Sequence, residues 1–366
     1  MGLREEAQVR NGIITGWGKC LPPAVLSNRD LETVTETSDE WITSRTGIKE
    51  RRISHVEMSD LSAVASERAM AAAGVTAEDL DLILVATCSP DRLVPSASTI
   101  IQAKIGASNA AGMDLNAACS GFLFTLSTAE QMIKTGAMNT VLIVGAEKLS
   151  YWLDFSNRST SVLFGDGAGA VIVQGVDDKP GEGLLAFEIG SDGTAGDLLY
   201  VPASGTEGSA DRTELPTFLM EGQEVFRRAV TSMAEASARV VEAAGLELDE
   251  IDIFIPHQAN VRIIDATARR LNLAPEKVFV NIASYGNTSA ATIPIAIVEA
   301  LEEGKIRPGA AIVFAAFGAG FTWAAAAYRW GSRTDPIGTS EVELPPNDKT
   351  ALELLAGNIA LHGRGT

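Results

Sequence analysis

Continuous apolar runs separated by segments of helical periodicity are the main pattern of this chain. Residues 82–86 (LILVA), 141–147 (VLIVGAE) and 311–318 (AIVFAAFG) are apolar almost throughout. Strands buried on both faces have this composition, whereas strands with one solvent-exposed face alternate apolar and polar residues. Because helical stretches lie between these runs, we predict an α/β fold whose sheets are covered by helices.

Residues 309–328 form a twenty-residue segment without a charge. Its length meets the criterion for a membrane-spanning helix. Gly318, Ala319 and Gly320 interrupt it with residues typical of a turn, and they leave two apolar stretches of strand length. We therefore predict a buried hairpin of two core strands and no membrane span.

The chain contains an internal repeat. Residues 71–86 align without a gap on residues 242–257, at an offset of 171, and each copy reads as a helix end, a glycine stop, an acidic turn and a buried strand. Residues 113–136 align on 279–304 at an offset near 168, which makes Asn287 the counterpart of Cys119, each at a helix N-terminus. We expect two α/β halves of common ancestry, packed as a layered α/β/α/β/α sandwich.

We divide the chain into an N-terminal half, residues 1–176, a C-terminal half, residues 177–331, and an extension of unknown role, residues 332–366. The Gly-, Asp- and Ser-rich segment 177–215 is expected to connect the halves, with a strand or two inside it. The extension is turn-rich and polar, and residues 349–361 predict one short amphipathic helix. We expect it to be an appendage to the core.

Composition excludes several classes of protein. With 366 residues, 46% of them hydrophobic and 21% charged, the chain has ordinary globular values. Its 29 Lys and Arg against 47 Asp and Glu give a net charge of −18. Non-specific binding to nucleic acid or to an anionic membrane needs basic surface, so neither is expected.

Three cysteines, Cys20, Cys88 and Cys119, are too few and odd in number for a disulfide framework, which indicates a reducing compartment. The first ten residues carry four charges and no apolar stretch of the signal-peptide type. We therefore expect a cytoplasmic protein.

The candidate chemistry centres on Cys119, which follows an apolar strand and opens a helix. There the positive end of the helix dipole stabilises a thiolate, although a small buried cysteine is the alternative interpretation. Cys20 and Cys88 are interpreted as buried structural cysteines. His257 stands at the end of a buried strand, in IPHQAN, while His55 and His362 lie in polar segments. If the halves are related by a pseudo-twofold axis, Cys119 and Asn287 meet.

Several motifs in one order resemble the β-ketoacyl-acyl carrier protein synthase III family of the thiolase superfamily. They are AACSGF at Cys119, PHQAN at His257, GNTSAA at Asn287, FGAGFTW at 317–323, SDEWITSRTGIKERR at 38–52 and FGDGAGA at 164–170. The resemblance covers roughly residues 11–331. It implies the five-layer thiolase sandwich, usually as a homodimer.

The resemblance also implies a two-step condensation that initiates fatty acid biosynthesis. Cys119 takes an acyl group from acyl-CoA, with the backbone N–H groups of Cys119 and Ala319 as the oxyanion hole. Malonyl-acyl carrier protein then loses CO₂, and His257 with Asn287 stabilises the enolate that attacks the acyl-cysteine. The CoA thioester is a substrate, and neither a metal nor a bound cofactor is expected. Ala319 stands where the family usually has glycine.

The family pattern assigns further residues to the binding of substrates. Trp41 and Arg158 hold the CoA adenine, Arg45 takes a phosphate and Asn260 contacts the pantetheine arm. For Trp41 the alternative is core packing, and for Asn260 it is helix capping. The residues expected to form the acyl pocket are Val94, which reaches across the dimer interface, and Leu149, Phe164, Leu199 and Phe218. Because Val94 is smaller than the aromatic residue that restricts primers to acetyl groups, we expect branched or longer primers.

A basic helix face is expected to dock the acidic carrier protein. Arg262, Arg269 and Arg270 recur at a spacing that places them on one face, for which a solvated surface is the alternative. A polyketide-priming or pyrone-forming condensing enzyme keeps the same three reactive residues and remains open. An acyltransferase of the same fold does not need the asparagine. The primer, the pathway and the carrier of the malonyl group are not decided by the sequence.

Overall fold

Two β-sheets form the centre of the molecule in this computed structural model, which describes residues 10–177, 179, 181–206 and 216–362. The first sheet has five strands, in the spatial order β1 (Arg10–Cys20), β7 (Asp166–Asp177), β6 (Thr140–Lys148), β4 (Leu82–Ala86) and β5 (Ala111–Leu115). The second has four, in the order β11 (Ile253–Pro256), β12 (Ala311–Gly318), β13 (Thr322–Arg329) and β8 (Gly183–Ser191).

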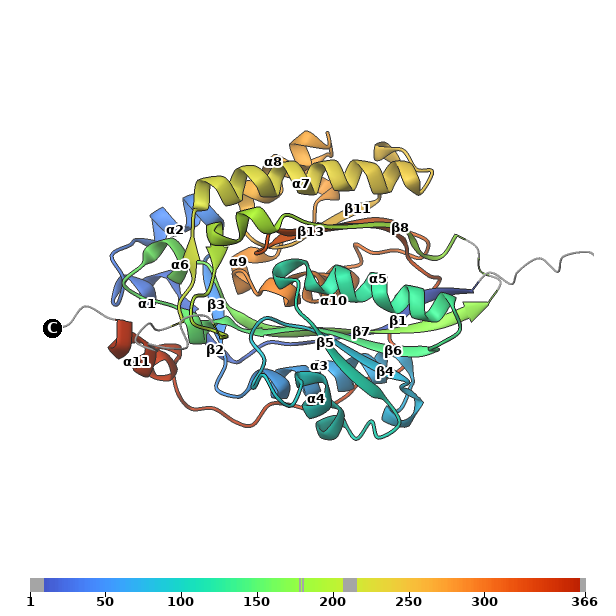
Figure 1. Ribbon diagram of the computed structural model, residues 1–366, viewed down its shortest axis with the longest axis horizontal. Helices are drawn as coiled ribbons and strands as arrows, with labels where there is room; N and C mark the ends of the chain where they lie inside the picture. The colour runs from blue at the N-terminus through green and yellow to red at the C-terminus, as the bar shows by residue number, and fades with distance from the viewer. Residues whose placement is uncertain (1–9, 178, 180, 207–215, 363–366) are drawn as a thin grey trace, which may run out of the picture.

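Helices cover both outer faces and fill the space between the sheets, which gives five layers (Figure 1). Beneath the first sheet lie α3 (Met58–Ala73) and α4 (Ala97–Ile105), between the sheets lie α5 (Gly121–Lys134) and α10 (Thr292–Glu302), and above the second sheet lie α7 (Gly222–Ala243) and α8 (Val261–Arg270). The predicted α/β/α/β/α thiolase-like sandwich is confirmed.

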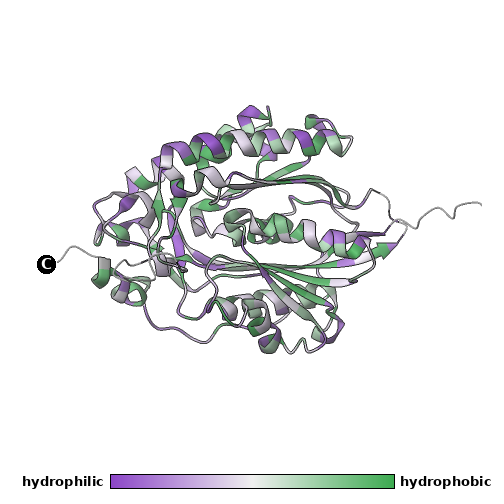
Figure 2. Cartoon of the chain, in the orientation of Figure 1, coloured by the Kyte–Doolittle hydropathy of each residue, from purple (hydrophilic) through white to green (hydrophobic). Residues whose placement is uncertain are grey.

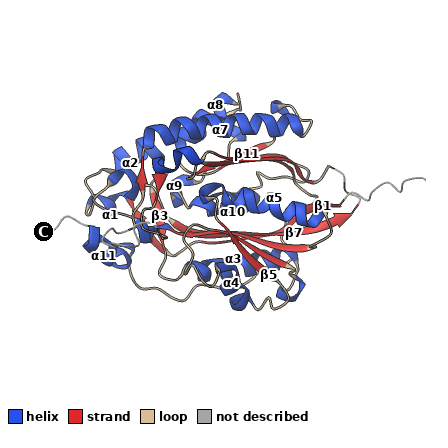
Figure 3. Cartoon of the chain, viewed as in Figure 1, coloured by secondary structure: helices blue, strands red, loops and turns tan. Residues whose placement is uncertain are grey.

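Several of the remaining helices and strands lie at one end of the sandwich (Figure 3). The strands are β2 (Ala24–Ser27), β3 (Glu50–Ile53), β9 (Leu199–Tyr200) and β10 (Leu219–Met220). The α-helices are α1 (Asn28–Glu32), α2 (Asp39–Thr46), α6 (Arg158–Ser161), α9 (Ile282–Tyr285) and α11 (Ala351–His362). The 3₁₀ turns are η1 (Ala77–Asp79), η2 (Ala118–Ser120), η3 (Leu149–Trp152), η4 (Gly193–Leu198), η5 (Leu248–Glu250), η6 (Pro275–Lys277) and η7 (Ser289–Ala291).

The two sheets repeat one topology. The order β4, β6, β7, β1 matches β11, β12, β13, β8, and in each set the first pair is parallel and the later pairs are antiparallel. The strand β5 has its counterpart only in a single bridge between Phe254 and Val278. The first sheet therefore ends in an edge strand that the second sheet lacks.

The apolar patterns fold as expected. Residues 309–328 supply β12 and β13, which pair in antiparallel register from Ala311 with Arg329 to Gly318 with Thr322. Every residue of β12 is buried because helices cover both faces of its sheet. Apolar residues accordingly concentrate in the strands and the helices between them (Figure 2). Within the part of the chain described above, no helix is long and apolar enough to cross a membrane.

The segments that connect and follow the two halves contain the expected elements. The connecting segment 177–215 contains two strands, β8 and the two-residue β9, and β8 forms an edge of the second sheet; residues 178, 180 and 207–215 lie outside the described residues. The predicted helix at 349–361 is confirmed as α11, and the extension packs against the body of the molecule. The N-terminal residues 1–9 also lie outside the described residues.

Candidate active site

One cavity of about 970 Å³ collects the reactive residues of both halves. Cys119, His257 and Asn287 all line it. So do most of the residues that the sequence assigns to substrates, namely Trp41, Arg45, Leu149, Arg158, Phe164, Leu199, Phe218, Asn260, Arg262 and Ala319. The tertiary structure thus joins residues that are up to 278 positions apart in the chain, from Trp41 to Ala319.

Cys119 lies in the turn η2, between the end of β5 and the start of α5. The preceding residue, Ala118, has a left-handed backbone with φ of 46°, and its N–H is bonded to the Asn116 side chain at 3.1 Å. A non-glycine residue in this conformation is strained, and such strain clusters at functional sites. The sharp turn brings the thiol to the N-terminal side of α5 and into the cavity.

At Cys119, burial acts against the stabilisation of a thiolate that a position at a helix N-terminus favours. Burial raises the pKa of the Cys119 thiol to about 12. Glu147, at the end of β6, adds to this effect with its negative charge and accepts a hydrogen bond from Ser289 Oγ at 3.0 Å. Cys119 is therefore a thiol in the free protein and must lose its proton during attack.

His257 follows β11, and its backbone N–H continues the sheet to Ala315 O at 2.7 Å. Its side chain is 1% exposed, and burial lowers its pKa to about 3, so the ring is neutral at pH 7. Nδ1 lies 2.7 Å from Thr292 Oγ1, and that hydroxyl donates to Ser289 O at 2.9 Å. With its single hydrogen used, the hydroxyl accepts from Nδ1–H, which leaves a lone pair on Nε2.

Asn287 is held by the other half of the chain. Its N–H donates to Leu163 O at 2.8 Å, and its carbonyl accepts from Gly165 N–H at 3.1 Å. Its side-chain Oδ1 accepts from Ser289 N–H at 2.8 Å. The Nδ2 group is therefore the part of this amide that can donate to a substrate.

The expected equivalence of Cys119 and Asn287 needs correction. The turns η2 and η7 begin at Ala118 and Ser289, which share the left-handed backbone, and α5 and α10 follow at the same offset of 171. Cys119 thus corresponds to Ala290, while Asn287 enters the cavity from the loop before η7. The two residues meet, but they do so from positions that the repeat does not relate.

The oxyanion-hole candidates are held together by backbone packing. A Cβ on Gly318 would lie 2.7 Å from the Cys119 nitrogen, so only glycine allows this approach. Thr322 Oγ1 lies within hydrogen-bond distance of Ala117 O at 2.8 Å and of Ala319 O at 3.2 Å, which ties the two segments. Ala319 is not among the residues with positive φ, so its methyl group is tolerated where the family usually has glycine.

The aromatic and basic residues at the other end of the cavity form a closed stack. The guanidinium carbons of Arg158 and Arg45 lie 4.7 and 4.9 Å from the centre of the Trp41 ring. Trp41 is half-buried in α2, which contacts α8. Asn260 caps α8 through Oδ1, which accepts from Arg262 N–H at 2.9 Å, so the capping interpretation holds and leaves Nδ2 for a ligand.

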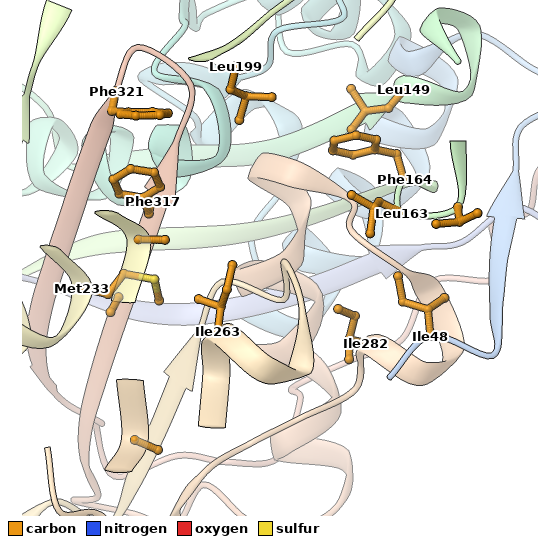
Figure 4. Close-up of a cluster of buried hydrophobic side chains, with 14 of the residues drawn as sticks. Ile48, Leu149, Leu163, Phe164, Leu199, Met233, Ile263, Ile282, Phe317 and Phe321 are labelled. Carbon is orange, nitrogen blue, oxygen red and sulfur yellow. The ribbon is translucent and has the colours of Figure 1, made fainter. Parts of the chain in front are cut away.

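Aromatic side chains form the apolar end of the cavity. Phe164 and Phe218 stack with centroids 4.4 Å apart, Trp152 meets Phe218 edge-on, and Leu149 lies beside Phe164 (Figure 4). Val94 does not line the cavity of its own chain: it is 85% exposed. The expected contact of Val94 with a partner's acyl pocket stays a prediction.

The three arginines of α8 are exposed but not equivalent. Arg262 lines the cavity, whereas Arg269 lies on the helix surface beyond it. Arg270 Nη1 donates to Thr231 Oγ1 at 3.0 Å, and Nη2 lies 3.7 Å from Glu235. The basic face therefore borders the cavity, with Arg270 partly neutralised by α7.

Sequence reasoning missed several polar residues around the reactive groups. Thr292, Ser289 and Thr322 position the imidazole, the amide and the oxyanion hole, and each stands within or beside a motif already quoted. Glu147 had a stronger signal, because it is a carboxylate at the end of an apolar run. Cys88 also lines the cavity, with Sγ 3.3 Å from Glu147 Oε1, and burial raises its pKa.

The described residues of the cavity do not form a cluster of metal-ligating side chains. Over residues 10–362, leaving aside the short gaps named above, there is no group of three or more His, Cys, Asp or Glu side chains arranged to hold a metal ion. Cys20 is buried away from the cavity, and His55 Nε2 is within 2.7 Å of Pro345 O.

Comparison with known proteins agrees with this geometry. The family described as 3-oxoacyl-[acyl-carrier-protein] synthase III matches residues 113–193, and its C-terminal part matches residues 241–330. A beta-ketoacyl-[acyl-carrier-protein] synthase III 2 from Vibrio cholerae is 52% identical over 347 residues, or 94% of this chain and 95% of the relative. The beta-ketoacyl-[acyl-carrier-protein] synthase III from Geobacillus kaustophilus is 50% identical over 320 residues, which are 87% of this chain and 98% of the relative.

Solved structures give the same answer. The synthase III from Thermus thermophilus is 42% identical with a TM-score of 0.83, covering 88% of this chain and all of that one. The priming β-ketosynthase of the R1128 polyketide pathway is 35% identical with a TM-score of 0.84, and the match covers 92% of this chain and 100% of that one. The sequence and the fold that the chain shares with these proteins lead to one conclusion: the chain belongs to the β-ketoacyl-[acyl-carrier-protein] synthase III family and is a condensing acyltransferase of the thiolase fold.

Proposed function

We propose that this enzyme condenses an acyl-CoA primer with malonyl-acyl carrier protein through an acyl-cysteine on Cys119, the step that initiates fatty acid biosynthesis. The observation that carries the proposal is that a thiol, a neutral imidazole and an amide donor line one cavity, with an apolar aromatic end and an arginine–tryptophan end. Such an arrangement fits an acyl chain, a reacting thioester and a nucleotide in one line.

The first half-reaction uses the proton acceptor on His257. Nε2 takes the Cys119 proton while sulfur attacks the thioester carbon, and the oxyanion receives hydrogen bonds from the N–H groups of Cys119 and Ala319. The C–S bond to CoA then breaks, and the leaving thiolate takes the proton from the imidazolium. The acyl group remains on Cys119, and the ring returns to its neutral state.

In the second half-reaction, His257 Nε2 has to donate a hydrogen bond, whereas in the first it accepts a proton. The neutral ring changes tautomer by exchange with solvent water: Nδ1 releases its proton, Nε2 takes one up, and the Thr292 hydroxyl turns its hydrogen from Ser289 O to Nδ1. Nε2–H and Asn287 Nδ2 then donate to the malonyl thioester oxygen as CO₂ leaves and the electron pair moves into the enolate. The α-carbon attacks the acyl carbonyl, the C–S bond to Cys119 breaks, and the Cys119 thiolate takes up a proton from solvent water.

CoA binding requires the arginine–tryptophan stack to open. Arg158 already occupies one face of Trp41 at 4.7 Å, and it also donates to Glu36 O at 3.2 Å. An adenine ring needs that face, so Arg158 moves outward and closes over the base. Arg45 binds phosphate, and Asn260 Nδ2 binds the pantetheine arm.

A homodimer accounts for the exposed edge of the first sheet. The edge strand β5 presents Met113, and the nearby loop presents Leu93 and Val94, 75% and 85% exposed. An exposed strand edge with apolar neighbours favours pairing with a second sheet. In such a pair Val94 reaches the acyl pocket of the partner.

A panel of primers tests the function. Wild-type protein is incubated with acetyl-, isobutyryl- or octanoyl-CoA, and the mass of the acyl-enzyme and of the product formed with malonyl-acyl carrier protein is measured. We expect isobutyryl- or octanoyl-CoA to exceed acetyl-CoA in kcat/KM, with graded differences because each buried CH₂ is worth about 0.8 kcal/mol. Strict acetyl preference contradicts the primer assignment. A product formed only with a polyketide carrier protein favours the priming role of the R1128 relative.

Charge reversal on α8 tests carrier docking. We expect Arg262→Glu with Arg269→Glu to raise KM for malonyl-acyl carrier protein by about threefold to tenfold, and KM for acyl-CoA less, because surface charges steer an acidic partner. Arg307→Glu is the matched control, since Arg307 is exposed before the start of β12, opposite the Gly318 end. Equal effects on both substrates remove the docking assignment.

A further inference from the structure

The C-terminal extension is tied along the outer layer of the molecule. After β13, the guanidinium of Arg333 donates to Ala72 O at 2.9 Å, and the Ile337 and Gly338 N–H groups donate to Ala72 O and Ala71 O. Arg68 Nη2 then donates to Val342 O at 3.1 Å. Figure 1 shows this segment passing beneath α3 and leading to α11 at the opposite end. Its course is therefore fixed before the helix begins.

The helix α11 is packed into the core that surrounds the cavity. Ala351 is 2% exposed and Leu355 is 4% exposed, and both belong to the buried cluster that contains Leu149, Phe164 and Phe218. The helix contacts β2 and β3. An isolated helix of this length is marginal in water, so the burial of Ala351 and Leu355 stabilises α11 in this position.

Asn358 links α11 to the wall of the cavity. Its Nδ2 group donates to Ser150 O and to Tyr151 O, each at 2.9 Å. These carbonyls belong to the turn η3, whose first and last residues, Leu149 and Trp152, line the cavity. On the other side, Asp166 accepts from Ser150 N–H at 2.9 Å and from Ser150 Oγ at 2.7 Å. The turn is thus clamped between β7 and α11.

We propose that α11 is part of the acyl-binding apparatus and that Asn358 is a specificity-determining positioning residue. By holding η3 in place, Asn358 sets how far Leu149 and Trp152 extend into the apolar end, and so which primer chains fit. The inference rests on the proposed function, because it assumes that this end of the cavity takes the acyl group. It assigns a role to an extension outside the two family-matched segments.

The test compares Asn358→Ala and Asn358→Leu with Asn347→Ala. Asn347 lies in the same extension but bonds only within it, to Lys349 O and N–H. We expect both Asn358 variants to change the ratio of kcat/KM for octanoyl-CoA to that for isobutyryl-CoA by about threefold to tenfold, because two hydrogen bonds that fix the wall are lost. Hydrogen exchange of residues 149–152 is expected to accelerate. The Asn347 variant keeps the wild-type ratio.

Failure of the inference about α11 can be distinguished from failure of the proposed function. If wild-type protein forms the acyl-enzyme but both Asn358 variants keep its primer ratio, α11 has no role in specificity and the inference is overturned, whatever the exchange rates show. The same holds if Asn347→Ala shifts the ratio equally. If wild-type protein forms no acyl-enzyme with any of these CoA esters, the proposed function fails and this inference fails with it.

Discussion

Replacing Cys119 by alanine is expected to abolish acyl-enzyme formation and to lower the condensation rate on the order of 10⁴-fold or more, as loss of a covalent nucleophile does elsewhere. The reason is geometric as well as chemical. The left-handed turn at Ala118 places the backbone nitrogen of Cys119 against Gly318, next to Ala319, and the N–H groups of Cys119 and Ala319 are the oxyanion-hole candidates. Intact-protein mass after incubation with acyl-CoA is the direct measurement.

The other two cysteines supply the controls for this experiment. Cys20 is buried at the end of β1, outside the cavity, so Cys20→Ala is expected to keep acylation at the wild-type level. Cys88 lines the same cavity beside Glu147 and is the only plausible competitor among the three. Peptide mapping that finds the acyl group on Cys88 in the wild-type protein contradicts the assignment of the nucleophile.

Removing the enolate donors is expected to separate the two half-reactions. We expect Asn287→Ala to lower the decarboxylation of malonyl-acyl carrier protein by about 10²–10³-fold, the cost of one oxyanion donor, while the acyl-enzyme still forms. His257→Ala is expected to lower condensation by about 10²–10⁴-fold and to slow acylation as well, because Nε2 serves both steps. Single-turnover acylation and CO₂ release are measured separately on each variant.

A surface asparagine provides the comparison for the second experiment. Asn109 is exposed and donates to Glu78 O at 3.0 Å, so Asn109→Ala is expected to leave both steps unchanged. Equal loss of acylation and decarboxylation in Asn287→Ala would show that the amide supports the cavity and does not bind the enolate. Retention of both steps in that variant would remove Asn287 from the mechanism altogether.

The cavity differs in one respect from what local sequence predicts about reactivity. A cysteine before a helix is expected to be a thiolate, yet burial keeps the Cys119 thiol protonated and the His257 imidazole neutral. Both groups are therefore neutral at pH 7 in the free enzyme. Helix position alone could not show this, because desolvation depends on what the rest of the chain packs around the sulfur.

The internal repeat misplaced one residue. Asn287 was aligned with Cys119, but a loop of different length before η7 shifts the register by three residues. Val94 is exposed in its own chain, which is compatible with the expected reach into a partner's acyl pocket, and its role stays a prediction. In both cases a linear pattern named a residue and gave no information on the direction from which it approaches.

The amino-acid sequence by itself determined the class of fold, the repeat of two halves, the core hairpin of residues 309–328 and the identity of Cys119, His257 and Asn287 as candidates. Apolar run length, turn residues and motif spacing are local properties, so they can be read without coordinates. Only the tertiary structure decided the protonation states, the Thr292 link to His257, the closed stack on Trp41 and the contact of α11 with η3. Each of these depends on residues distant in the chain coming within a few ångströms, which burial of the core imposes and no local pattern encodes.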